Sequence, residues 1–474
     1  MFCVISDRLR SSLTLAAATF LMIVICAVSL PAVPAAEPPT QAPPPNVLMI
    51  ISDDQAATDY GFMGHPIIQT PHLDRLASQS ALFRSGYTPT PLCRPSLMSM
   101  ITGRYAHEHG VTGNDPRQRP GLTPEQYAAL REQLISKIDS IPTIPKSLGQ
   151  QGYVSMQSGK WWEGNYSRGG FTSGMTRGFP QQGGRHGDDG LDIGRKTLAP
   201  VLNFISESAA AKKPFFVWYA PMLPHTPHNP PQRLLKKYQA TDRPIELAKY
   251  YAMCEWFDET CGELLQHLET TAQADNTLVI YVTDNGWIQA TPQMQLPQEW
   301  NHGFAPRSKQ SVYQGGVRTP IMYRLPGRIQ PGDYPQLATT LDVLPTVFQA
   351  AGLDVPNDLP GIGLLPFLSG TAELTRETVC GEGYTHDIED LDNPEASLLT
   401  RWCISGSWKL ILSWDAPSDR YAFAHNGYEK SPQLYNLETD PGETKNEAAA
   451  NPEVVARLTQ HLQQNWAVSR DHRR

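Results

Sequence analysis

The chain has 474 residues, of which 40% are hydrophobic and 18% are charged, as is typical of a globular protein. This length exceeds what one small core organises, so we expect a large domain with a smaller one. The formal net charge of -8 excludes nucleic acid as the main partner, because phosphate binding requires a basic face.

A signal peptide is predicted over residues 1–36. Arg8 and Arg10 precede an apolar run at residues 13–30, and small residues suited to cleavage follow that run. We therefore expect export to the periplasm or the extracellular space, with residues 37–45 as a proline-rich linker. The run is near the lower length limit of a membrane span, so an uncleaved anchor is the alternative, although stable membrane insertion is not expected.

Four apolar runs of strand length end near polar residues. The residues near their ends are Asp53, Asp54, Lys160, His225, Asp284 and Asn285. Helical segments are expected between the strands, at 197–208, 246–270 and 335–352. Continuous apolar strands alternating with helices predict an α/β fold, with a large, mostly parallel or mixed sheet sandwiched by helices. The carboxyl ends of such strands share one edge, so these six side chains are expected at one rim.

Oxygen donors dominate this predicted rim. Asp53, Asp54, Asp284 and Asn285 supply carboxylate and amide oxygens, which suit Ca²⁺ or Mg²⁺ better than Zn²⁺. Without a cation, clustered carboxylates would repel one another. Taken singly, SDD and TDNG each indicate a tight turn more than a site, because Asp, Asn and Gly favour turns. Two such turns at the same end of one sheet favour a site.

The segment TPTPLCRPSLMSMITGRY, residues 88–105, places a cysteine at the start of a predicted helix. Pro95 suits the first helical position, and Gly103 can end the helix. A thiolate at a helix N-terminus is stabilised, so a lowered pKa is expected for Cys93. Its flanking prolines and arginine are not the apolar surroundings of a core thiol, which indicates a functional cysteine.

The remaining cysteines of the expected mature chain have a simpler interpretation. Cys254 and Cys261 lie on one face of the helix at 246–270, two turns or roughly 10 Å apart. That distance is too long for a disulfide, so both are expected as buried core thiols. Cys380 and Cys403 could pair with each other, which leaves Cys93 unpaired.

A change of character near residue 375 predicts a second unit. RWCISGSWKLILSW, residues 401–414, alternates as a hairpin does, and residues 451–468 form an amphipathic helix. We expect a catalytic α/β domain at 46–374 and an α+β subdomain at 375–474, with a small antiparallel sheet and a closing helix that wall one side of the pocket.

In kind and order, several motifs together resemble those of the sulfatase family of the alkaline phosphatase superfamily, from Asn46 to about Trp466. They are SDD, CRPS followed by TGRY, GKWW, PHTPH, TDNG, KQSVYQGGVRTP and LYNLETDPGETKN. The resemblance implies an exported enzyme that hydrolyses sulfate esters of carbohydrates or aryl alcohols.

The resemblance also implies roles for individual residues. Cys93 would be oxidised to formylglycine by a maturation enzyme, and the hydrate of that aldehyde would attack sulfur. The metal ligands implied are Asp53, Asp54, Asp284 and Asn285, and the groups on the sulfate and the leaving oxygen are Lys160, His225 and Lys309. Apart from the resemblance, Arg94 is a candidate substrate contact beside Cys93. Arg185, His186, His228 and His302 lie in expected loops that could contact substrate, although a loop surface is at least as good an explanation for each of these four.

Three positions depart from the family motifs. Leu97 stands where the family has an arginine, Trp162 where it has a histidine, and Gln314 where it has a glutamate. Arg94 or His107 would then support the aldehyde instead. Because the implied metal ligands and both lysines are retained, we favour a working hydrolase. The alternatives are a phosphodiester or phosphonate ester hydrolase and a metal-containing protein that binds sulfated glycans without turnover.

Overall fold

The computed structural model describes residues 43–298, 300–415, 420–425 and 429–469. The predicted signal peptide and most of the predicted linker lie outside these ranges. Within them, no helix combines the length and the apolar character needed to cross a bilayer.

The predicted α/β fold is confirmed. A nine-stranded sheet has the order β10-β2-β8-β7-β1-β6-β4-β5, with β9 paired to β2. Its centre consists of the four expected strands, all parallel: β1 (Asn46–Ser52), β4 (Val154–Gly159), β6 (Phe215–Ala220) and β7 (Thr277–Thr283). The sheet becomes mixed at β8, which runs antiparallel to both β7 and β2. The other strands are β2 (Ala81–Tyr87), β5 (Ser173–Gly174), β8 (Arg318–Arg324), β9 (Gly332–Tyr334) and β10 (Ala338–Thr339).

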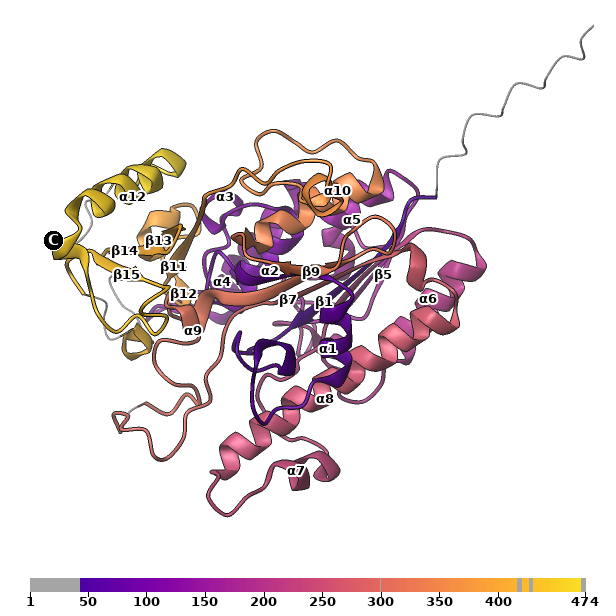
Figure 1. The fold of residues 1–474 in the computed structure, drawn as a ribbon, viewed down its shortest axis with the longest axis horizontal. Coiled ribbons are helices and arrows are strands. Elements are labelled where there is room, and N and C mark those ends of the chain that lie inside the picture. Colours follow the sequence, from indigo (N-terminus) through magenta and orange to yellow (C-terminus); the bar gives the residue numbers. More distant parts are fainter. Residues whose placement is uncertain (1–42, 299, 416–419, 426–428, 470–474) are drawn as a thin grey trace, which may run out of the picture. The chain divides into compact units, whose positions relative to one another are not determined.

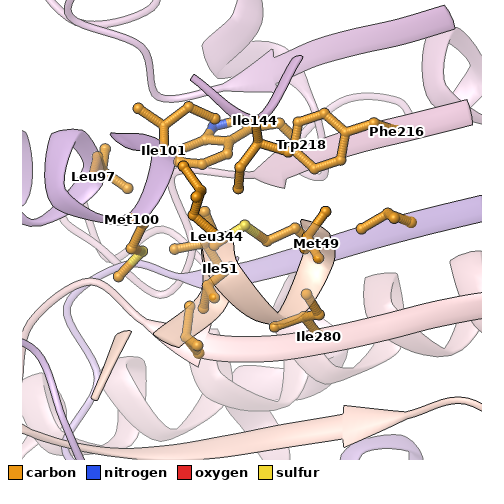
Figure 2. Packing of buried hydrophobic residues seen from close by; sticks show 14 of the residues in the cluster. Met49, Ile51, Leu97, Met100, Ile101, Ile144, Phe216, Trp218, Ile280 and Leu344 are labelled. Atoms are coloured by element: carbon orange, nitrogen blue, oxygen red, sulfur yellow. The ribbon is translucent and has the colours of Figure 1, made fainter. Parts of the chain in front are cut away.

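Helices cover both faces of this sheet (Figure 1). On one face, β1 presents Met49 and Ile51 to a core shared with α2 (Cys93–Thr102), α5 (Ile144–Gly149) and α10 (Val343–Ala351) (Figure 2). The alternate residues of β1 face the other core, which includes α1 (Pro71–Ser78), α6 (Ala199–Ala210) and α8 (Ile245–Thr270). Strand residues alternate between two apolar layers, which explains why the runs are continuously apolar. The remaining helices are α3 (Ala106–His109), α4 (Pro124–Ser136), α7 (Gln232–Tyr238), α9 (Gln314–Val317) and α11 (Leu365–Leu368).

The helix expected at 335–352 is shorter than predicted. Residues 338–339 pair with β2, and a 3₁₀ turn at Thr340–Asp342 precedes α10. The Asp342 carboxylate accepts a hydrogen bond from the Thr339 amide at 2.9 Å, and the Thr339 hydroxyl accepts one from the Leu341 amide at 3.4 Å. This reciprocal cap starts the helical region after residue 339.

Met49 offers a test of the core around the site-bearing strands. Its side chain is completely buried, so Met49→Ala should lower the free energy of unfolding by about 2–5 kcal/mol through lost contacts and a cavity. Urea denaturation measures this change. The control Ile67→Ala, at a position 38% exposed, should cost less than about 0.5 kcal/mol; equal losses would contradict the core assignment.

The expected C-terminal sheet and helix are present. Four antiparallel strands have the order β11-β13-β14-β15, and β13 and β14 form the predicted hairpin. Leu458 and Leu462 of α12 (Pro452–Asn465) are buried against this sheet. The strands are β11 (Thr378–Tyr384), β13 (Leu398–Ser405), β14 (Trp408–Ser413) and β15 (Gln433–Asn436). The domain boundary at residues 374–375 stays a prediction.

All five cysteines in the described residues are free and buried. Cys254 and Cys261 lie in the core around α8, as expected. Cys380 and Cys403 face each other in the register of β11 and β13, but no disulfide joins them in the structure.

Candidate functional site

The carboxyl ends of the central strands converge on one site, as the sequence predicts. Asp53 and Asp54 directly follow β1, Lys160 follows β4, and Asp284 with Asn285 follows β7. Lys309 and the helix that begins at Cys93 complete the group. A cavity of about 280 Å³ opens here, and its walls include Asp54, Cys93, Lys160, His225 and Lys309.

Hydrogen bonds fix the turns after β1 and β7 against each other. The Asp54 amide donates to Asp284 Oδ1 at 3.1 Å, and Asn285 Nδ2 donates to Asp54 Oδ1 at 2.7 Å. Asp54 adopts a left-handed backbone conformation, with φ at 61°. Aspartate tolerates this conformation better than most residues, and such positions are common at functional sites. The two turns are thus a rigid base for the acidic groups.

Two lysines bridge the acidic groups and Cys93. Lys160 Nζ lies 2.8 Å from Asp53 Oδ1 and 3.4 Å from Cys93 Sγ. Lys309 Nζ lies 2.6 Å from Asp54 Oδ1 and 3.3 Å from Cys93 Sγ. Burial disfavours the Lys309 cation, but Asp54 and the other acidic groups hold its pKa well above the usual range. Burial disfavours the Lys160 cation as well, but Asp53 and Cys93 raise its pKa. Both ammonium groups therefore carry charge at neutral pH, and both contact the sulfur atom.

The acidic group fits a divalent cation. Asp284 Oδ2 and Asn285 Oδ1 are buried and have no hydrogen-bond partner in the described part of the chain. Burial raises the pKa of Asp53 to about 6 and also raises that of Asp284, which reflects the cost of holding these carboxylates ionised together. Ca²⁺ and Mg²⁺ bind hard oxygen atoms of this kind, so a cation here would supply the missing partner.

The distances between possible ligand atoms favour a different set of donors, with Cys93 and His225 in place of Asp284 and Asn285. One ligand atom from each of Asp53, Asp54, Cys93 and His225 lies within 4.8 Å of the others. We favour the oxygen donors over this set, because a protonated thiol is a poor ligand and the unpartnered atoms belong to Asp284 and Asn285.

The lowered pKa expected for Cys93 is wrong. Burial raises the pKa of the thiol to about 12, despite the two nearby lysines. The helix begins at Cys93 itself and not at Pro95, and the Cys93 side chain is buried. A thiol that stays protonated at neutral pH is not an activated nucleophile.

His225 reaches the site from the loop after β6. Its Nδ1 lies 2.6 Å from the Thr226 carbonyl oxygen, and its Nε2 lies 3.3 Å from Asp54 Oδ2. Burial lowers the pKa of the imidazole to about 4, so the ring is neutral at pH 7.

The structure places three of the candidate substrate contacts at the cavity and two away from it. Arg185, His186 and His302 line the cavity. Arg94 does not, because its guanidinium is buried in an ion pair with Glu163. His228 does not either, and packs between the rings of Tyr250 and Trp287.

The three residues that depart from the family motifs lie in different parts of the structure. Leu97 is buried in the apolar core between α2 and the sheet (Figure 2). Trp162 lines the cavity, with the Arg185 guanidinium 4.6 Å from its ring centre. Gln314 accepts a hydrogen bond from the Tyr87 hydroxyl and lines a different cavity. His107 pairs with Glu382 and does not line the cavity, so the structure lends no support to the expectation that it supports the aldehyde.

Sequence reasoning missed much of the cavity wall. The additional lining residues are Asn114, Thr226, Trp287, Phe304, Gln310, His386, Arg420 and Tyr421. His386 belongs to the C-terminal part, which is tied to the segment after Asn114 by the short parallel pairing of β3 (Asp115–Pro116) and β12 (Asp387–Ile388). A two-residue pairing between distant segments leaves no periodic signal in a sequence.

Two family profiles and several known proteins match the chain. The sulfatase family profile matches residues 45–353, and the profile of the C-terminal region of N-sulphoglucosamine sulphohydrolase matches residues 301–468. The chain is 28% identical to N-acetylgalactosamine-6-sulfatase of Canis lupus familiaris, with 89% of this chain and 86% of the relative aligned. It is also 28% identical to human arylsulfatase A, over 88% of this chain and 87% of that protein.

Solved structures agree as well. A Pseudoalteromonas sulfatase superposes with a TM-score of 0.66 at 19% identity, covering 90% of this chain and 92% of that one. At this identity the likeness supports the fold alone. The family matches favour sulfate ester hydrolysis over the two alternative functions. The chain therefore belongs to the sulfatase family and is a sulfuric ester hydrolase.

Proposed function

We propose that this protein is an exported sulfatase that acts through a formylglycine derived from Cys93 and a divalent cation, Ca²⁺ or Mg²⁺. The observation that carries the proposal is the position of Cys93 Sγ, 3.4 Å from Lys160 Nζ and 3.3 Å from Lys309 Nζ at the cavity wall. The proposed metal ligands are Asp53, Asp54, Asp284 and Asn285. When present, the aldehyde group would supply the nucleophilic oxygen, and the cation would act as a Lewis acid.

The lysines bind the sulfate group of the substrate. Their ammonium groups flank the position of the nucleophile, so they contact the non-bridging oxygens and stabilise charge that develops on them. Both are held in place by aspartate partners before substrate arrives, which limits the reorganisation needed during the reaction.

Protonation of the leaving oxygen falls to Lys309 or His225. Lys309 carries a proton at neutral pH, because Asp54 and the other acidic groups raise its pKa. His225 has a pKa of about 4 through burial, so at pH 7 it is neutral and holds its Nδ1 proton on the Thr226 carbonyl. These protonation states favour Lys309 as the general acid, with His225 orienting the leaving group.

The proposed substrate is a sulfated carbohydrate, with aryl sulfates as the second class. Trp287, Phe304 and Tyr421 line the cavity and offer flat apolar faces for a sugar or aryl ring. Arg185 adds a cation at the same wall. A relative of this chain is named for a sulfated N-acetylgalactosamine, which is consistent with this class.

Mass spectrometry of Cys93 in protein made in its own host tests the proposal. Trypsin should release residues 85–104 intact, because Pro95 protects the bond after Arg94. We expect the peptide to carry the mass of an aldehyde in place of the thiol, although Leu97 stands where the family has an arginine. If only the unmodified thiol is found, the formylglycine mechanism does not apply to this protein.

A further inference from the structure

We infer that the buried ion pair between Arg94 and Glu163 is a positioning device that holds Cys93 against Lys160. The inference rests on the proposed roles of these two residues. Arg94 directly follows Cys93 in the chain, and Glu163 comes three residues after Lys160. The pair therefore ties together the two segments whose separation sets the geometry of the nucleophile and the sulfate-binding cation.

The contacts between the two side chains are short and bidentate. Arg94 Nε donates to Glu163 Oε1 at 2.8 Å, and Arg94 Nη2 donates to Glu163 Oε2 at 2.6 Å. The side chains are 3% and 4% exposed. Two parallel hydrogen bonds in a fork fix orientation as well as distance, and burial protects them from competition by water.

Asn114 joins the pair as a third anchor. The Arg94 amide donates to Asn114 Oδ1 at 3.1 Å, and Arg94 Nη1 donates to the Asn114 carbonyl at 3.0 Å. Asn114 itself lines the cavity. Arg94 thus donates hydrogen bonds to one cavity residue, Asn114, from both its backbone amide and its guanidinium.

Neither Arg94 nor Glu163 lines the cavity, whereas their chain neighbours Cys93 and Trp162 do. Any effect of the pair on chemistry therefore passes through those neighbours. Leu97, one helical turn beyond Cys93, has an apolar side chain buried in the core and supplies no polar anchor. Within the described residues, the start of α2 and the loop after β4 are joined by this ion pair and by the 3.4 Å contact of Lys160 Nζ with Cys93 Sγ.

An ion pair with a purely structural role should respond differently to substitution by apolar residues. Apolar residues of similar volume can often replace a buried pair without loss of stability. A positioning pair is not replaceable in this way, because apolar packing lacks the fixed fork geometry. Removing both charges therefore distinguishes the two roles without leaving one charge buried alone.

The first experiment does not depend on turnover. Protein produced without the maturation enzyme keeps Cys93 as a thiol, and mass spectrometry follows its alkylation by iodoacetamide together with that of Cys261. In the double variant Arg94→Met/Glu163→Leu, we expect Cys93 to react at least about tenfold faster, because the start of α2 is no longer fixed. Cys261, buried in the core around α8, reports global unfolding and should not change. Unchanged reactivity at Cys93, or equal acceleration at both cysteines, would overturn the inference.

The second experiment measures kcat and KM on an aryl sulfate, per molecule of aldehyde-bearing protein. Glu163→Gln lies outside the CRPS motif, so we expect normal maturation, with kcat reduced about 100-fold and KM nearly unchanged. Glu443→Gln is the matched control, since it breaks another buried pair, Lys409–Glu443 at 2.7 Å, away from the catalytic cavity. That variant should lose thermal stability but keep its kcat. A Glu163→Gln enzyme with wild-type kcat contradicts the positioning role. A wild-type protein that carries only a thiol contradicts the proposed function instead, and alkylation then decides the positioning role alone.

Discussion

Cys93→Ala is expected to lower kcat/KM for a sulfate ester by at least about 10⁴-fold, the scale of loss on removing a nucleophile. Alanine cannot provide an aldehyde, and it removes the one side-chain atom that both Lys160 and Lys309 contact at position 93. The backbone of α2 should keep its place, because Arg94 and Ser96 retain their hydrogen bonds. Steady-state kinetics measures the loss, and circular dichroism checks the fold.

The matched control for this variant is Cys261→Ala. Cys261 is an equally buried thiol, but it lies in the core around α8. Its loss should reduce stability modestly and leave kcat/KM within about twofold, as for other core changes away from a site. If Cys93→Ala keeps substantial activity, the nucleophile is another group and the proposed mechanism falls. If both variants lose activity equally, the effect of Cys93→Ala reflects stability and not chemistry.

The positions of the strand-end residues could be predicted because parallel strands all end at the same edge of the sheet. Continuous apolar runs predict β1, β6 and β7, and the weaker run VSMQSG predicts β4. Parallel strands present their carboxyl ends at one edge. Asp53, Lys160 and Asp284 therefore come together in the structure as the sequence indicates. Their chemical roles rest on the proposals above.

Other features could not be read from the sequence because they depend on burial and on long-range pairing. The helix N-terminus suggested an acidic Cys93 thiol, but desolvation outweighs the helix and the lysines and raises the pKa. The sequence suggested Arg94 as a substrate contact, but the structure pairs its guanidinium with Glu163, 69 residues away. His386 is brought to the cavity by contacts between segments far apart in the chain, the β3–β12 pairing and the hydrogen bond from the Asn114 amide to the His386 carbonyl.

Removal of divalent cations should abolish turnover and destabilise the fold. With a chelator, Asp53, Asp54 and Asp284 lose a shared counterion, and the unpartnered oxygens of Asp284 and Asn285 stay buried without compensation. We expect kcat/KM to fall more than about 100-fold, with recovery on adding Ca²⁺ or Mg²⁺. A site saturated at 1,000 times its Kd adds about 4 kcal/mol to the free energy of unfolding, so chelation should visibly lower the melting temperature.

A pair of carboxylate variants separates this site from general effects of cations on the protein. Asp284→Asn keeps the shape of the side chain but removes a proposed ligand charge, so the melting temperature should no longer respond to Ca²⁺. Asp59→Asn is the control, because Asp59 is a buried carboxylate that accepts a hydrogen bond from the Tyr250 hydroxyl at 2.7 Å and does not line the cavity. Its melting temperature should still rise with Ca²⁺, as in the wild type. Equal responses in both variants would place the cation elsewhere, and full activity after exhaustive chelation would mean that the two lysines stabilise the transferred sulfate without a metal.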